Sequence, residues 1–143
     1  MRREEKYPNT STFYYYNANP KNRITTDCVT RALCTALDIP YNQVVIELAE
    51  LQCKTGYDTS DKALFDKYLQ AKGWTKYKQP RKRDNTKYTG EEFCRELSKE
   101  NGCFNYKRVV ANIGGHHIVA IIDGRVHDIW DSTSKCIGNY WAK

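Results

Sequence analysis

The hydrophobic period of this chain changes once, close to Asn101-Gly102. Before that point apolar residues recur at helical spacing, and after it they alternate or form continuous β-branched runs, as in strands. Helices followed by strands predict an α+β fold, with an N-terminal helical half packed on a C-terminal antiparallel β-sheet. The length of 143 residues suits one domain over 1–143, in which we expect 1–12 to be a flexible N-terminal arm.

Helix-capping and turn residues predict where the helices and strands of the two halves begin and end. Thr26 or Asp27 can cap a first helix that runs to about Leu37, and Thr89 begins a capping-box pattern for the fourth. Further helices are expected over 40–54 and 61–72, and the fourth ends near residue 99. Strands are expected at 13–16, 74–77, 109–113, 117–122, 125–130 and 140–142, and Asp123-Gly124 is a strong hairpin signal.

Cys28 stands where a polar run gives way to the first helical pattern. A cysteine in the first turn of a helix meets unpaired backbone N–H groups and the positive end of the helix dipole. Both favour the thiolate, which is the nucleophilic form, so Cys28 is the candidate nucleophile. The alternative is an ordinary buried helix cysteine. Arg31, one turn later, either anchors a carboxylate of the sheet half or covers apolar surface with its stem.

Two histidines and two aspartates follow on the expected strands. His116 and His117 begin one strand, and Asp128 and Asp131 lie on the next. A cysteine, then a histidine, then a carboxylate is the order of a papain-type thiol hydrolase. The residue opposite His117 depends on the length of the hairpin turn, so the strand register leaves both aspartates open as the orienting acid.

Several short motifs together resemble the small papain-like cysteine peptidase domains of bacteria and their phages. They are Asn19-Pro20-Lys21, Asp27-Cys28-Val29-x-Arg31-Ala32-Leu33, Gly73-Trp74, the pattern from His117 to Asp131, and Asn139-Tyr140-Trp141. The resemblance covers 13–142 and implies a papain-like cysteine proteinase fold with a groove between its two halves. It implies Cys28 as nucleophile, His117 as general base and Asp131 as orienting acid, with Asp128 as second choice. His116 stands where the family pattern has a small residue, and it is expected at the solvent-facing rim of the groove.

The same resemblance implies an oxyanion donor about six residues before the nucleophile, where papain-like enzymes commonly have Gln. This chain has Asn22 there, so Asn22 or Asn19 is the candidate donor, beside the Cys28 backbone N–H. The alternative is an asparagine that only stabilises a turn. We expect no cofactor and no metal site, since the chain has no Cys-x-x-Cys pair.

The charge and the apolar content of the chain bear on its binding partners and its cellular location. The net charge is +6, and basic residues concentrate in 76–87, which is either a solvated loop or a nucleic-acid patch. No apolar stretch reaches the length of a signal peptide core or a membrane span, which predicts a cytoplasmic protein without membrane partners. Its six cysteines are then expected to stay reduced.

The predicted function is hydrolysis of a peptide or isopeptide bond through a thioester on Cys28. The expected partner is a peptide or protein substrate, and a host protein is a second candidate target. An amidase on peptidoglycan stems or a transglutaminase-like enzyme would use the same residues. The alternative is a catalytically inert papain-like protein that binds a host protein or, less favourably, nucleic acid through the basic loop 76–87.

Overall fold

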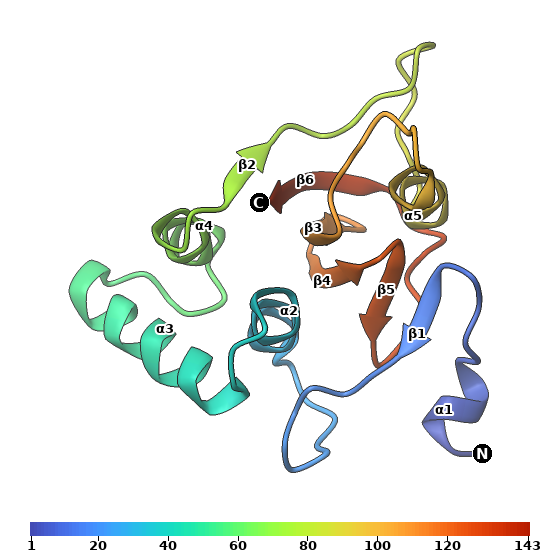
Figure 1. Ribbon diagram of the computed structural model, residues 1–143. Helices are drawn as coiled ribbons and strands as arrows, with labels where there is room; N and C mark the ends of the chain where they lie inside the picture. The colour runs from blue at the N-terminus through green and yellow to red at the C-terminus, as the bar shows by residue number, and fades with distance from the viewer.

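The computed structural model describes residues 1–143 as five helices and one six-stranded sheet (Figure 1). This confirms the α+β class. In chain order the elements are α1 (Arg3–Lys6), β1 (Phe13–Tyr15), α2 (Cys28–Leu37), α3 (Tyr41–Thr55), α4 (Lys62–Ala71), β2 (Thr75–Tyr77), α5 (Gly90–Ser98), β3 (Arg108–Ile113), β4 (His117–Ile122), β5 (Arg125–Asp128) and β6 (Ile137–Ala142).

The sheet has the strand order β1-β5-β4-β3-β6-β2. Four of its strand pairs are antiparallel, but β1 runs parallel to β5, with Tyr15 opposite Asp128. The expectation of a wholly antiparallel sheet is therefore wrong, and the sheet is mixed. Two parallel strands need a long crossover connection. In this fold the connection consists of all the residues between β1 and β5.

Helices cover both faces of this sheet (Figure 1). One buried cluster joins α2, α3 and α4 to residues such as Val110, Ile118 and Trp141. The other joins α5 to the alternate positions, among them Val109 and Val119. The expectation that the helices form one half is thus wrong for α5, which packs on the opposite face. Because β3 and β4 are covered on both sides, they are continuous apolar runs rather than alternating ones.

The hairpin between β4 and β5 has the expected two-residue turn. Asp123 and Gly124 have φ of 49° and 75°, and Ile122 pairs with Arg125. At Gly124 a Cβ atom would lie 1.9 Å from Oγ of Ser98, so the turn packs directly against α5. This hairpin fixes the position of both strands that carry candidate site residues.

Three segments differ from the expected ones. The strand β5 ends at Asp128 instead of residue 130, and β6 begins at Ile137 instead of residue 140. The N-terminal arm contains α1, and Arg3 donates a hydrogen bond from Nε to the Ile129 carbonyl at 2.7 Å. The N-terminal arm therefore contacts the segment that follows β5.

Candidate active site

Cys28 is the first residue of α2, and Asp27 is its N-cap residue. The Asp27 carboxylate does not cap the helix through a side-chain hydrogen bond, because its oxygens bind other partners. The backbone N–H groups of the first turn therefore stay directed at the start of the helix, where the half-buried sulfur of Cys28 lies. This is the local position that the sequence predicts for the nucleophile.

The surroundings of Cys28 favour its thiolate. Burial raises the pKa of Cys28, but the His117 side chain, the Ile118 backbone amide and the positive charges of His117 and Arg31 lower it. The lowering effects are larger, so the pKa lies below the ordinary value of 9.0. A lowered pKa separates a reactive cysteine from an inert buried one.

His117 begins β4 and lies between Cys28 and Asp128. Its Nε2 bonds Oδ2 of Asp128 at 2.5 Å, which leaves Nδ1 for the Cys28 sulfur. Burial lowers the pKa of His117, but Asp128 and Cys28 raise it more strongly, to about 9. The imidazole therefore holds its proton at neutral pH, and its positive charge favours the thiolate form of Cys28.

The structure corrects the predicted orienting acid. Asp131 does not contact His117; its Oδ1 accepts hydrogen bonds from N and Oγ1 of Thr133 at 2.9 and 2.6 Å, and it stabilises a turn. Asp128, the second choice, is the carboxylate that binds His117 and is 1% exposed. In the structure the carboxylate that contacts His117 is therefore Asp128 and not the predicted Asp131, and the candidate site comprises Cys28, His117 and Asp128.

Arg31 connects this site to the start of α2. Its NH1 donates to Oδ1 of Asp128 at 2.5 Å, and its Nε donates to Oδ1 of Asp27 at 2.8 Å. Arg31 is only 6% exposed, so the first of its two predicted roles, anchoring a carboxylate of the sheet, is what the structure shows. One guanidinium between two carboxylates leaves a net negative charge, which a protonated His117 offsets.

Two further side chains complete the polar surroundings of Asp27. Tyr41 donates its hydroxyl to Oδ2 of Asp27 at 2.6 Å, and Asn19 donates from Nδ2 to the same oxygen at 3.0 Å. A buried ion pair stabilises a fold only when its remaining lone pairs are satisfied, and these bonds satisfy them. The sequence predicted Asn19 as a candidate oxyanion donor and Asp27 as a candidate cap, but it did not identify Tyr41 or these contacts. Asp27 and Arg31 do have the i, i+4 spacing of a helical ion pair.

The predicted oxyanion donor lies elsewhere. Asn22 is exposed, has a φ of 54°, and accepts a hydrogen bond from Nδ2 of Asn17 at 3.4 Å. It does not line the hollow beside Cys28. The amide of Asn19 is engaged by Asp27. The structure thus shows the turn role for Asn22, and the backbone N–H of Cys28 is the donor that remains at the helix start.

Two other residues frame the histidine. Trp130 lies over His117, with ring centroids 5.0 Å apart and planes inclined by 40°. Because Trp130 is only half-buried, its indole forms one wall of the site and limits the access of water to the ring of His117. His116 is exposed, as expected for a rim residue. A two-residue hairpin turn predicts that Trp130 lies opposite His117, so the register could have identified this contact.

A hollow of about 230 Å³ opens beside Cys28. Its lining includes the hydroxyl side chains of Thr25, Thr30, Thr59 and Ser60, the last two from the connection between α3 and α4. The basic loop 76–87 lies apart from this hollow and projects beyond the sheet in Figure 1. Within the loop, Lys82 forms an ion pair with Glu92 of α5.

No family model, curated protein or solved structure matches this chain. Among the helices of the structure, none combines the length and apolar content that a membrane span requires. The fold and the geometry of the site therefore carry the functional argument.

Proposed function

We propose that this protein is a papain-like cysteine hydrolase that cleaves a peptide or isopeptide bond through a thioester on Cys28. The observation that carries the proposal is the meeting of Cys28, His117 and Asp128, from α2, β4 and β5, with the pKa of the thiol lowered and that of the imidazole raised. A thiolate beside an imidazolium is the ground state of cysteine hydrolases of this type.

In the first half of the reaction, the Cys28 thiolate attacks the carbonyl carbon of the scissile bond. The negative charge that develops on the carbonyl oxygen is stabilised by the backbone N–H of Cys28 at the positive end of α2. His117 gives its Nδ1 proton to the leaving amine, the C–N bond breaks, and the acyl group remains on sulfur as a thioester.

In the second half, His117 is neutral and accepts a proton from water at Nδ1. The resulting hydroxide equivalent attacks the thioester carbonyl, the C–S bond breaks, and the carboxylic acid leaves while Cys28 returns to the thiolate. Asp128 holds the ring through Nε2 at both stages and stabilises its charged form. Arg31 acts through Asp128 and is a positioning residue.

The hollow beside the nucleophile suggests which side chains the substrate presents. Its walls carry five hydroxyl groups, from four threonines and one serine, and Val29 is the largest apolar side chain among them. Hydroxyls favour hydrogen-bonding partners, and a bulky apolar residue would leave them unpaired. We therefore propose that the residue next to the scissile bond is small or polar, within a peptide or protein substrate.

The test is the pH dependence of alkylation by iodoacetamide, followed at each cysteine by peptide mass spectrometry. Cys53, Cys103 and Cys136 are exposed and serve as internal reference thiols in the same sample. Cys28 should react faster than these three at pH 6.5, although it is half-buried, and His117→Ala should remove the difference. The proposal fails if Cys28 reacts no faster than the reference thiols in the folded protein.

Substrate class is tested with peptide vinyl sulfones, which trap a nucleophilic thiol covalently. Probes with Gly or Ser next to the warhead should label Cys28 faster than matched probes with Phe or Leu. Equal labelling by all four would contradict the substrate preference while leaving the nucleophile intact. A Cys28→Ser variant supplies the blank.

A further inference from the structure

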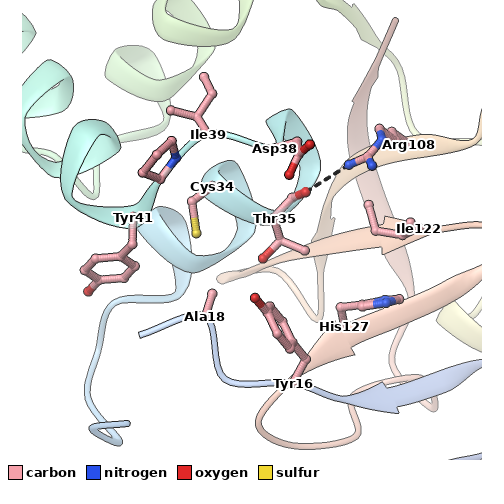
Figure 2. A pocket seen from close by; sticks show the side chains of 11 residues that line it. Tyr16, Ala18, Cys34, Thr35, Asp38, Ile39, Tyr41, Arg108, Ile122 and His127 are labelled. Atoms are coloured by element: carbon pink, nitrogen blue, oxygen red, sulfur yellow. Dashed lines mark hydrogen bonds between the residues drawn. The ribbon is translucent and has the colours of Figure 1, made fainter. Parts of the chain in front are cut away.

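The largest cavity of this protein lies at the other end of α2 from Cys28. It measures about 480 Å³, roughly twice the hollow beside the nucleophile, and Figure 2 shows the side chains that line it. Cavities of about 300–1,000 Å³ are typical of sites for small ligands. The segments around it are the residues after β1, the C-terminal end of α2, the connection to α3, and the ends of β3, β4 and β5.

Aromatic rings form one side of this cavity. Tyr16 and His127 lie next to each other in Figure 2, with ring centroids 6.3 Å apart, and Tyr16 is 44% exposed. Outside the lining, the Tyr14 ring centroid lies 5.0 Å from that of His127, and the Arg125 guanidinium lies 5.1 Å from the Tyr14 ring centroid. Exposed aromatic rings interleaved with arginine are a surface on which nucleobases stack.

The histidine of the cavity presents a hydrogen-bond acceptor. Nδ1 of His127 lies 2.9 Å from the Arg125 carbonyl, so that nitrogen carries the proton and Nε2 has the free lone pair. Burial and the positive charges of Arg125 and Arg108 lower the pKa of His127, so the ring is neutral at pH 7. An exocyclic amine or ring N–H of a base is a suitable donor to Nε2.

The opposite side of the cavity carries a cation without an acidic partner. Arg108 uses NH1 to bind the carbonyls of Thr35 and Ala36 at 3.1 and 3.2 Å, and it forms no salt bridge (Figure 2). Its remaining N–H groups and its charge are available to an anion. The one carboxylate in the lining is Asp38, which with the Thr35 hydroxyl can bind sugar hydroxyls.

We propose that this cavity binds a nucleotide, with the base against Tyr16 and His127 and the phosphate at Arg108. The nucleotide is either free or part of a single strand, since both present the same base and phosphate. The excess of basic over acidic residues, 23 against 17, favours either anion. This site differs from the basic loop 76–87, and it does not depend on the hydrolase activity.

The experiment is a titration of the full chain with the four ribonucleoside 5′-monophosphates and with a uridine hexanucleotide, followed by tyrosine fluorescence. Wild type should bind at least one monophosphate saturably, and the matching nucleoside more weakly. Tighter binding of the hexanucleotide than of UMP would assign the site to a single strand, and equal binding would assign it to a free nucleotide. A wild type that binds neither class of probe overturns the proposal.

Single substitutions test whether the nucleotide binds in this cavity. Tyr16→Ala, at an exposed position, should weaken binding by about fivefold or more, as expected for the loss of one stacking ring. Arg108→Gln should weaken binding of the monophosphate but not of the nucleoside, and a circular dichroism melt checks that α2 is retained. Lys78→Gln in the basic loop is the matched charge control. Binding that is lost in Lys78→Gln but unchanged in both cavity variants would overturn the assignment.

Discussion

Arg31 and Asp128 form a 2.5 Å ion pair between α2 and β5 whose side chains are only 7% and 2% exposed. The same guanidinium binds Asp27, so Arg31 pairs with two carboxylates, and His117 is the second partner of Asp128. Removing one partner of a buried pair leaves an uncompensated charge in a poorly solvated place. This relationship makes Arg31 the residue on which both the packing of α2 and the charge of the candidate site depend.

We therefore expect Arg31→Met to lower the free energy of unfolding by about 3–5 kcal/mol, as measured by urea denaturation at pH 7. Arg95→Met is the matched control, since Arg95 pairs with Glu91 at the surface, where a pair contributes about 0–1 kcal/mol. Equal effects of the two substitutions would contradict the structural role of Arg31.

Substitution of Asp128 and of Asp131 compares the effects of the two carboxylates on the reactivity of Cys28. Asp128→Asn should lower the pKa of His117 from about 9 toward the ordinary 6.5, because it removes the negative charge next to Nε2. Cys28 alkylation at pH 6.5 should then slow markedly. Asp131→Asn should leave alkylation unchanged, since Asp131 binds only the Thr133 turn. Slower alkylation in Asp131→Asn alone would reinstate the prediction made from the sequence.

The opposite shifts of the two groups predict the pH profile of any hydrolytic activity. The acid limb reflects protonation of the Cys28 thiolate and should lie below pH 9.0, the ordinary value for the thiol. The alkaline limb reflects loss of the His117 proton, which the leaving amine needs, and should fall near pH 9. A rate that keeps rising above pH 10 would be inconsistent with an imidazolium acid.

Gly124 tests how closely the hairpin approaches α5. Gly124→Ala should destabilise the fold more than Gly56→Ala, although the two glycines have similar φ of 75° and 77°. A Cβ at residue 124 meets Oγ of Ser98, whereas a Cβ at residue 56 meets nothing within 4 Å. The strain of a left-handed alanine, about 1 kcal/mol, is common to both. Thermal melts that rank the two variants equally would mean that Ser98 moves away at little cost.

Most of the helices and the central hairpin could be predicted from the sequence, because local patterns determine them. The apolar period identified α2, α3, α4 and α5, and the Asp123-Gly124 turn identified the hairpin that carries His117. The position of Cys28 at the start of α2 followed from the change of polarity at that point. These features are local, so short-range patterns determine them.

The orienting acid was also within reach of a simple parity argument. With the two-residue turn at Asp123-Gly124, Ile122 pairs with Arg125 and Ala120 with His127, and the same register carried one step further sets Val119 opposite Asp128. His117 is two residues from Val119, so Asp128 is its diagonal neighbour on the same side of the hairpin. Asp131 lies beyond the end of β5, in a turn with Thr133, so the strand register does not place it beside His117. The sequence left the turn length open, and the prediction of Asp131 came from the resemblance to papain-type enzymes.

Other features depend on contacts between distant segments and have no local signal. The parallel pairing of β1 with β5 joins Tyr15 to Asp128, and no turn chemistry specifies it. The position of α5 on the second face of the sheet depends on how its apolar stripe meets the alternate side of β3 and β4. The cavity around Tyr16 and His127 likewise forms only when the segment after β1, the end of α2 and the sheet come together.

The ion pair between Arg31 and Asp128 spans 97 positions of the chain. On a ribosome that adds about 5–20 residues per second, the nucleophile emerges roughly 5–20 s before the carboxylate that completes its surroundings. During that interval the nascent polypeptide carries an ordinary cysteine, without its imidazolium or its buried counter-charges. A chain that terminates before residue 128 would therefore lack the carboxylate that binds both Arg31 and His117.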